Sequence, residues 1–470
     1  MADLLKPDLC IIGRGATGIG LALWARQRGA TVVLVDRGIP EPGDPAHGLI
    51  ARAGLLASAA RAHAMATAGA VGLEATAPRP SFRSIGEHAA ELAAAAAPEH
   101  ANERLAALGV TEIRGAPSFA DRNTLTCGGT TLRARHFVLA TGAPPALPQI
   151  EGLDTVPFFT PDTVLSAVRK FSHLVVIGGE PAALELAQAY RRLGAEVTLV
   201  PQGPLLPGFD PELVALLTTA LAGEGLDIRI GFAAVAVQKR SQGTGVDIVG
   251  PDGNRDTLDV SHILVANGRA PDLGGDWLGK AGLNHHPGHP AQLLVDAEGR
   301  TSNRRITAIG GVAGDTQPAA IAHKSERLLD RLLGGRSATA PAPRHVATEP
   351  ALAEVGLIPA GTKPRPGFTV QRASLAENSA ARALGATRGS AKLVVSPRGQ
   401  IVGGGVVGTG AGETVALIAQ AMAHGVAAAE LSRLALPEPS ASAVLVALGR
   451  AVEANSAPTR RSGVLRRLLG

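Results

Sequence analysis

The chain has 470 residues, of which 45% are hydrophobic, and its formal net charge is +5. This length predicts more than one domain, and the mild charge with 3% aromatic residues excludes a base-stacking nucleic-acid surface. The only cysteines, Cys10 and Cys127, cannot build a disulfide framework or a cysteine metal cluster. We therefore expect no metal site. No stretch is apolar enough to span a bilayer and no secretory signal is visible, so we expect a cytoplasmic protein.

The first glycine-rich segment has the pattern of a dinucleotide-binding turn. The apolar run Leu9–Ile12 is typical of a buried strand, and Gly13, Gly15 and Gly18 follow it at the G-x-G-x-x-G spacing. Gly13 permits the tight turn, Gly15 lets the backbone approach a pyrophosphate, and Gly18 lets the following helix pack on the strand. The N–H groups at the start of that helix then face the phosphates.

The residues after this turn complete the unit. A helical pattern runs from about Ile19 to Arg28, and Thr31–Val35 is typical of a second strand that ends at Asp36. Asp36 lies close to the spacing at which an acidic residue accepts hydrogen bonds from a ribose. A ligand-free strand–helix turn is the alternative, but the strand, helix, second strand and acid in this order favour a dinucleotide site.

Further elements follow in chain order. An Ala-rich helix is expected at Leu55–Ala70, and a small β meander is expected from Val110–Gly115 and Thr124–Leu132. The apolar strand His136–Gly142 ends in a glycine turn and returns the chain to the first sheet. These features predict an α/β protein.

A second strand–turn–helix–strand unit repeats the first. It consists of the strand Leu174–Ile177, the helix Ala182–Leu193 and the strand Glu196–Val200. Ile263–Gly268 then echoes the apolar strand that preceded this unit. The repetition predicts a second nucleotide-type domain.

The last third of the chain predicts a different architecture. A strand at Arg305–Gly314 precedes a helix that ends near Leu333, and a polar linker covers Gly334–Pro343. Beyond it we expect an α+β domain with strands and two helices, at Leu352–Gly356, Ala391–Val395, Ile401–Val407, Gly412–Gly425 and Ser442–Ala454.

These segments, in this order, resemble the pyridine nucleotide-disulfide oxidoreductase family, which includes dihydrolipoamide dehydrogenase, glutathione reductase and mercuric reductase. The resemblance is carried by Gly13–Gly18 with Asp36, Leu139–Gly142, Val175–Glu185, Val265–Arg269, Ala308–Gly314, Thr348–Gly356 and Gly399–Glu413. It implies two Rossmann-like domains and a C-terminal α+β dimerisation domain. The implied boundaries are 1–155 with 273–340 for a split FAD-binding domain, 156–272 for an NAD(P)-binding-like domain, 344–458 for dimerisation, and 459–470 for a basic tail.

The resemblance also implies the cofactors FAD and NAD(P)H, a homodimer, and cofactor-binding residues. For FAD these residues are Gly13, Gly15, Ala16, Thr17, Gly18, Asp36, Arg37, Gly115, Ala116, Ala140, Thr141, Gly142, Gly311 and Ala319. The weaker NAD(P) candidates are Gly178, Gly179, Glu185 and Gly268.

The redox-active cysteine pair of this family has no counterpart here. The two cysteine positions of its motif fall on Pro45 and Ile50, and the motif's lysine falls on Gly54. Disulfide reduction needs a thiolate, which neither side chain can form. In the same segment, His47 and Arg52 are expected near the flavin, where they would contact flavin or substrate; a solvated role is the alternative for each.

Other family positions are also changed. Glu438 and Ala443 stand where the family has its acid–base His and Glu, so no catalytic residue is assigned. Glu180 replaces the second glycine of the second turn, and its charge opposes a pyrophosphate and so disfavours NAD(P)H in the usual pose. Gly311 replaces an aspartate that contacts the ribityl chain, and Asp315 would need a different loop path to compensate.

Two hypotheses remain open. The chain is either an FAD-dependent oxidoreductase without disulfide chemistry, with an unknown small-molecule substrate, or a redox-inactive pseudoenzyme that serves as a binding or assembly subunit with a protein partner. The intact first glycine turn favours the first, and the simultaneous changes at redox positions favour the second. The basic tail Arg460–Leu469 would dock a partner or an anionic surface, or it is simply solvated.

Overall fold

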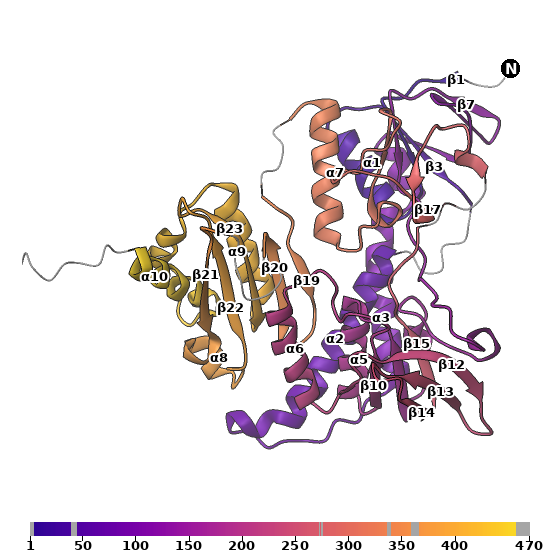
Figure 1. Cartoon of the computed structure of the whole chain (residues 1–470). Helices are drawn as coiled ribbons and strands as arrows, with labels where there is room; N and C mark the ends of the chain where they lie inside the picture. Colours follow the sequence, from indigo (N-terminus) through magenta and orange to yellow (C-terminus); the bar gives the residue numbers. More distant parts are fainter. Residues whose placement is uncertain are drawn as a thin grey trace, which may run out of the picture. The chain divides into compact units, whose positions relative to one another are not determined.

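The computed structural model describes residues 4–38, 45–271, 273, 276–335, 340–358 and 366–456. Its contacts divide the chain into two compact units, and many of their elements are labelled in Figure 1. Unit 1 comprises the described residues up to Pro207 and those from Ala222 to residue 335, and unit 2 comprises Gly208–Leu221 and the described residues from 340 onward. No helix within these ranges is long and apolar enough to cross a membrane. The basic tail lies outside the described residues.

A parallel sheet of five strands forms the first half of unit 1, in the order β18-β8-β2-β3-β4. Alternate residues of β2 face two cores: Leu9 and Ile11 pack with α1 and α7, whereas Cys10 and Ile12 pack with the meander. Burial on both faces explains the continuous apolar run. The elements are β2 (Leu9–Ile12), α1 (Ala16–Gln27), β3 (Val32–Asp36), β4 (Val110–Arg114), β8 (His136–Leu139), β18 (Ile306–Ala308) and α7 (Pro318–Leu333).

The structure corrects one expected strand. Val110–Gly115 was predicted within the meander, but β4 pairs in parallel with β3 over its whole length, from Val32 with Val110 to Asp36 with Arg114. A short half-buried strand has no local signal that selects its partner, so only the long-range pairing assigns it. The meander sheet, in the order β1-β7-β6-β5, consists of β1 (Leu4–Leu5), β5 (Ser118–Asp121), β6 (Thr124–Cys127) and β7 (Thr130–Leu132).

The second nucleotide-type unit forms as predicted. Its parallel sheet has the order β11-β10-β9-β15, and an antiparallel sheet of β12, β13 and β14 covers one face, where Val175 and Ile177 pack with Val246 and Ile248. The elements are β9 (His173–Ile177), α5 (Pro181–Arg192), β10 (Glu196–Val200), β11 (Asp227–Ile228), β12 (Ala233–Lys239), β13 (Thr244–Val249), β14 (Arg255–Val260) and β15 (His262–Val265). The hairpin of β16 (His285–His286) and β17 (His289–Leu293) forms a separate two-stranded sheet, and its Leu293 packs with the meander side of the first sheet.

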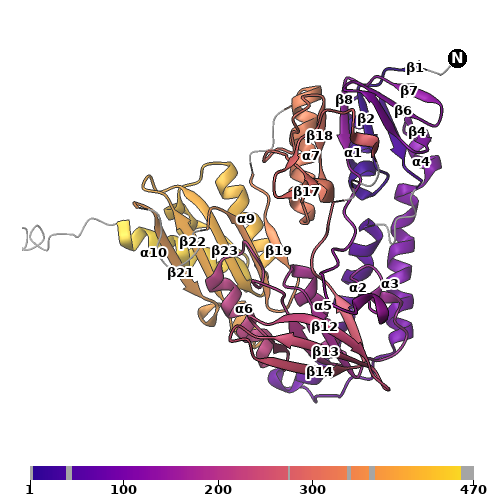
Figure 2. The ribbon, with the colours of Figure 1, turned by 45° about the vertical axis from the view of Figure 1, so that its right-hand side comes forward.

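The Ala-rich region forms two long helices that lie side by side in Figure 2, α2 (Pro45–Thr67) and α3 (Phe82–Ala96), followed by the short α4 (Asn102–Ala107). Ser81 caps α3 by accepting a hydrogen bond from the N–H of Ser84. The buried face of α2 carries Leu55, Ala59 and Ala62, and α2 also contacts α5. The alanines therefore serve close helix packing, and the predicted helix is confirmed and extends further toward the N-terminus.

Unit 2 is an antiparallel sheet with helices, as the sequence predicts. The strand order is β19-β20-β23-β22-β21. Leu393 and Val406 of the sheet pack with Val415 and Ile418 of α9 and with Leu448 of α10. The elements are α6 (Pro211–Gly223), β19 (Arg344–Val346), β20 (Ala351–Gly356), β21 (Thr369–Ser374), α8 (Ser379–Ala383), β22 (Ser390–Val395), β23 (Ile401–Gly408), α9 (Ala411–Ala423) and α10 (Val444–Ser456).

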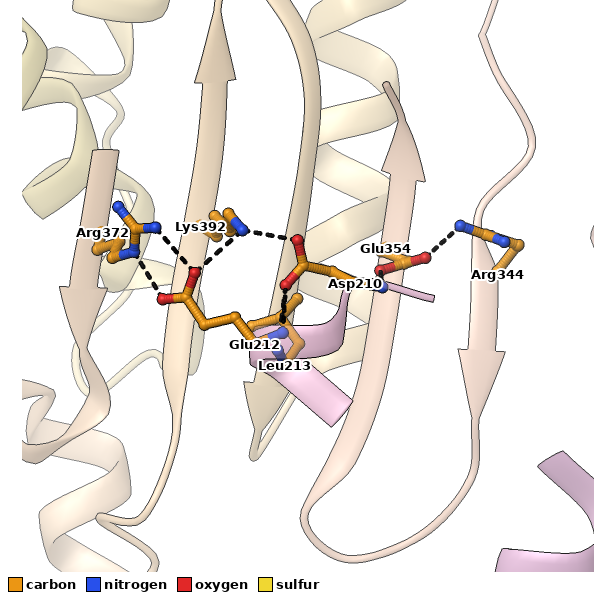
Figure 3. Close-up of polar contacts among 7 residues, drawn as sticks. All are labelled: Asp210, Glu212, Leu213, Arg344, Glu354, Arg372 and Lys392. Atoms are coloured by element: carbon orange, nitrogen blue, oxygen red, sulfur yellow. Dashed lines mark hydrogen bonds and ion pairs between the residues drawn. The ribbon is translucent and has the colours of Figure 1, made fainter. Parts of the chain in front are cut away.

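A buried ion-pair network joins the start of α6 to this sheet (Figure 3). Asp210 accepts hydrogen bonds through Oδ1 from the N–H groups of Glu212 and Leu213, at 3.0 and 3.1 Å. Its Oδ2 accepts a bond of 2.6 Å from Nζ of Lys392 on β22, which also lies 3.0 Å from Oε2 of Glu212. The Asp210 and Lys392 side chains are only 0% and 2% exposed, so each charge depends on its partner.

Two arginines extend the network at its edges. Arg372 holds both carboxylate oxygens of Glu212, and these hydrogen bonds, with those of Lys392, lower the pKa of Glu212 to about 2. Glu354 accepts a bond from the N–H of Asp210 and pairs with Arg344, yet burial raises the pKa of Glu354. Although α6 follows a strand of the second nucleotide-type sheet in sequence, these contacts make it part of unit 2.

We predict that Lys392→Met destabilises unit 2 by about 3–5 kcal/mol, because it leaves the Asp210 carboxylate buried without its cation. Denaturant unfolding, with hydrogen exchange at α6, measures this loss. Arg300→Met is the control: it removes a half-exposed ion pair with Asp296 and is expected to cost no more than about 1 kcal/mol. Equal stability of the two variants would contradict the role assigned to Lys392.

Candidate cofactor site

The first glycine turn requires the glycines that the sequence predicts. Gly13 has φ +119°, and a Cβ there would lie 2.2 Å from the carbonyl oxygen of Ala140. A Cβ on Gly18 would lie 1.9 Å from the carbonyl oxygen of Gly13. Gly15 is the residue before α1, with φ −73° and no side chain to cap the helix. The first-turn amides of α1, including those of Ala16 and Thr17, therefore form an anion-binding helix start without a capping side chain from this residue.

The predicted acid lies at the same sheet edge. Asp36 ends β3, and its Oδ1 accepts a 2.8 Å hydrogen bond from the N–H of Gly38. Arg114 Nε lies 3.6 Å from the other oxygen. The N–H of Gly115 donates to the Asp36 carbonyl, so the structure brings Gly115 and Ala116 beside the acid. Arg37, the next residue, lies over the ring of Trp277 at 5.3 Å.

The end of β8 and the turn after β18 close the other side of the site. Thr141 and Gly142 follow β8, and the 3-10 turn Gly310–Ala313 follows β18. Gly310 has φ +82°, and a Cβ there would lie 3.1 Å from Oγ1 of Thr17. A Cβ on Gly311 would lie 2.6 Å from that of Ala143, so no side chain fits at residue 311 in this loop arrangement. Ala319 lies in the first turn of α7.

These observations fit a dinucleotide. Gly13 is required by its contact with Ala140 after the neighbouring strand, and Gly18 by its contact with Gly13. Gly15 is not required by the backbone, because its φ and ψ of −73° and 177° suit any residue. The absence of a side chain at Gly15 therefore leaves space at the start of α1 for a ligand. The predicted FAD residues converge on the carboxyl ends of parallel strands, the usual place for such ligands.

The second glycine turn has the same backbone arrangement as the first but a different residue just before its helix. Gly178 has φ +137°, and a Cβ there would lie 2.1 Å from the carbonyl oxygen of Ala266, which mirrors the first turn. Glu180 precedes α5, and Pro181 begins the helix. The Glu180 side chain lies against Gly268, with Cγ 3.5 Å from the position of a Cβ there. Burial raises the pKa of Glu180.

The loop after β10 packs on this turn. The N–H of Leu206 donates a 2.7 Å bond to the carbonyl of Gly179, and a Cβ on Gly179 would lie 2.8 Å from the carbonyl oxygen of Pro204. The amide of Gln202 is bonded to both the N–H and the carbonyl of Ala234. The Gln202 side chain therefore fixes the loop to the strand that contains Ala234. The first residues of this loop include neither an acid nor an arginine that could bind an adenosine ribose.

An ion pair joins α2 to α5. Arg52 Nε lies 3.3 Å from Oε2 of Glu185, and the side chains are 23% and 5% exposed. The sequence singled out both residues separately but gave no signal that they meet, since they come from different predicted domains. The side chain of His47 lies outside the described residues.

The remaining changed positions are placed as follows. Ile50 is exposed on α2, and a Cβ on Gly54 would lie 2.9 Å from a methyl carbon of Leu92 on α3. Gly54 thus faces α3, so a lysine at this position would displace α3 before its side chain reached a ligand. Glu438 is exposed and accepts a 3.0 Å bond from Ser379, and Ala443 ends a 3-10 turn.

Both cysteines are buried, in β2 and β6, within one apolar cluster. Burial raises the pKa of Cys10 and of Cys127, which suppresses the thiolate form. Among the described residues, no group of three His, Cys, Asp or Glu side chains is placed to hold a metal ion.

Comparison with known proteins agrees with this geometry. Residues 7–326 match the family model described as pyridine nucleotide-disulphide oxidoreductase, and residues 342–448 match the dimerisation domain of the same family. The chain therefore belongs to the pyridine nucleotide-disulphide oxidoreductase family. Members of this family are oxidoreductases that bind FAD and use NAD(P)H, which confirms the predicted family, fold class and cofactor type.

Particular relatives cover nearly the whole chain. The mercuric reductase of Streptomyces lividans is 32% identical over 440 residues, covering 91% of this chain and 92% of its own. The dihydrolipoyl dehydrogenase of Thermus scotoductus is 31% identical over 466 residues, covering 95% and 97%. Among solved structures, the HOCl-induced flavoprotein disulfide reductase RclA of Escherichia coli superimposes with a TM-score of 0.78 at 22% identity, covering 94% of this chain and 99% of its own, and so shares the fold.

We predict that Gly15→Glu abolishes FAD retention in a folded protein, because the backbone tolerates a side chain there but the carboxylate would occupy the pyrophosphate's approach. Flavin absorbance per chain after gel filtration measures this. Gly20→Glu is the control, since a Cβ on Gly20 of α1 meets nothing within 4 Å. Unchanged flavin content in the Gly15→Glu protein would remove the cofactor assignment from this turn.

We also predict that Glu180→Gly tightens NADH binding at least about fivefold, because like charges near 4 Å repel by about 1–4 kcal/mol. Glu180→Gln, which removes the charge and keeps the size, should recover part of the gain. Fluorescence titration with NADH measures both. If neither variant binds NADH more tightly, Glu180 is not what limits this site.

Proposed function

We propose that this chain is an FAD-dependent oxidoreductase whose flavin exchanges electrons directly with its acceptor or donor, without a redox disulfide. The proposal depends on two residues of α2. By the resemblance described above, Pro45 and Ile50 stand at the positions of the family's two redox cysteines. Cys10 and Cys127 are no substitutes, because both are buried with raised pKa values. Disulfide exchange requires an accessible thiolate.

Their placement supports the following roles for the binding residues. The α1 amides and Gly15 bind the pyrophosphate, and Asp36 accepts hydrogen bonds from the adenosine ribose. Arg52, held by Glu185, supplies a fixed positive charge on the segment expected beside the flavin. Bound FAD would supply hydride and electron transfer.

Unit 2 supports a homodimer, because residues 342–448 match the family's dimerisation domain. The exposed Glu438, in the position of the family's acid–base histidine, favours reactions that need no proton donor from this segment. This change also favours the second hypothesis, a redox-inactive subunit that keeps the fold for binding or assembly. Flavin content separates the two.

The purified protein is expected to show a flavin absorption spectrum and to release FAD on denaturation. A Cys10→Ala/Cys127→Ala variant is expected to retain the wild-type rate of electron transfer from NADH or dithionite to ferricyanide, because neither thiol takes part. Both proteins should fail to reduce an aromatic disulfide reagent above the rate of free FAD.

Two outcomes would overturn this proposal. Loss of ferricyanide reduction in the folded double variant would mean that a cysteine carries electrons. Absence of flavin, even after incubation with excess FAD, would support the redox-inactive subunit.

A further inference from the structure

A buried carboxylate lies in the turn between β18 and α7. The N–H of Asp315 donates a 3.1 Å hydrogen bond to the carbonyl of Gly310, and Gly314 donates similarly to Gly311 at 2.9 Å. Gly310 in turn lies against Thr17 in the first turn of α1. The chain after β18 therefore folds back on itself, and the backbone of Asp315 is bonded to the glycine that contacts the first turn of α1.

The two oxygens of this carboxylate have different surroundings. Oδ1 accepts a 2.6 Å bond from Nζ of Lys324 on α7. Oδ2 is buried and has no hydrogen-bond partner among the described residues, and the side chain is only 12% exposed. Buried acceptors are rarely left without a donor, so Oδ2 is open to a hydrogen bond from a donor other than the described residues.

The neighbouring residue cannot supply this carboxylate. Residue 311 is glycine, and a Cβ there would lie 2.8 Å from the backbone nitrogen of Ala143. The close approach of the two turns excludes an acidic side chain at 311 unless they separate. The hydrogen bonds within residues 310–315 bring Asp315 back to Gly310. This is the different loop path that Asp315 needs in order to replace the aspartate missing at residue 311.

The sheet order indicates which part of a dinucleotide faces Asp315. The glycine turn after β2 is central, β3 with Asp36 lies on one side, and β8 followed by β18 lies on the other. A dinucleotide with its pyrophosphate at the α1 start and one ribose at Asp36 extends its second half toward β18. In FAD, that half carries the hydroxyl groups of the ribityl chain.

We propose that Asp315 binds a ribityl hydroxyl of FAD through Oδ2, and that Lys324 positions and neutralises the carboxylate so that it does not repel the pyrophosphate. The inference rests on the proposed FAD binding and deepens it. A hydroxyl donates the hydrogen bond that Oδ2 lacks, and a hydrogen bond to a charged acceptor is among the stronger ones.

The test compares two probes, FAD and ADP, by fluorescence quenching and calorimetry on the full-length chain stripped of flavin. Asp315→Asn is expected to weaken FAD binding about tenfold or more without weakening ADP binding, because ADP lacks the ribityl chain. Asp330→Asn is the matched control: it alters another buried aspartate, which pairs with Arg28, at the far end of α7 and should leave both affinities unchanged.

A second arm uses the unmodified chain, so that it does not depend on a variant folding. An FAD analogue without ribityl hydroxyls should bind wild-type protein more weakly than FAD by a similar factor, and Asp315→Asn should no longer distinguish the two. Equal FAD affinity of wild type and Asp315→Asn, or equal loss with ADP, overturns the role of Asp315 alone. Wild-type protein that binds ADP but not FAD overturns the proposed function as well.

Discussion

The close contact between a glycine and a neighbouring strand's carbonyl is the constraint on which the rest of unit 1 depends. Gly13 meets the carbonyl of Ala140, and Gly178 meets that of Ala266; both have a positive φ, of +119° and +137°, and an added Cβ would lie 2.2 and 2.1 Å from the carbonyl oxygen. Both turns therefore keep the residue that the fold requires. The two turns differ at the residue just before the helix, where a pyrophosphate would approach the backbone. This residue is Gly15 in the first turn and Glu180 in the second. The two turns therefore share one backbone architecture but present different side chains to a ligand.

In both units, buried charged side chains lie next to a partner of opposite charge. Lys392 and Asp210 are buried together, and Glu185 is buried with Arg52 beside it, so the described interior holds these charges in pairs. Such pairs connect elements that are distant in sequence: α6 to β22 in unit 2, and α2 to α5 in unit 1. The second pair connects α2, whose sequence contains no cysteine, to the helix that follows the second glycine turn.

Local pattern predicted the elements that are buried on both faces. The strands β2 and β9 and the helices that follow them are recognisable because apolar runs and glycine turns are local signals. The partner of β4 was predicted wrongly, because Val110–Arg114 is half-buried and its pairing with β3 is a long-range choice. The Arg52–Glu185 pair, the packing of Gly54 on α3 and the attachment of α6 to unit 2 depend on contacts between segments far apart in sequence. Sequence reasoning identified Asp315 but could not show that its turn folds back toward α1.

The central claim is that flavin is the only redox centre of this protein. Anaerobic titration of the purified, FAD-loaded chain with dithionite, followed by visible absorption, tests it most directly. The account predicts complete flavin reduction after about two electrons per flavin, without the long-wavelength band that a thiolate beside oxidised flavin produces. Uptake of about four electrons per flavin, with such a band at the midpoint, would reveal a second two-electron centre of the disulfide type and would contradict the account.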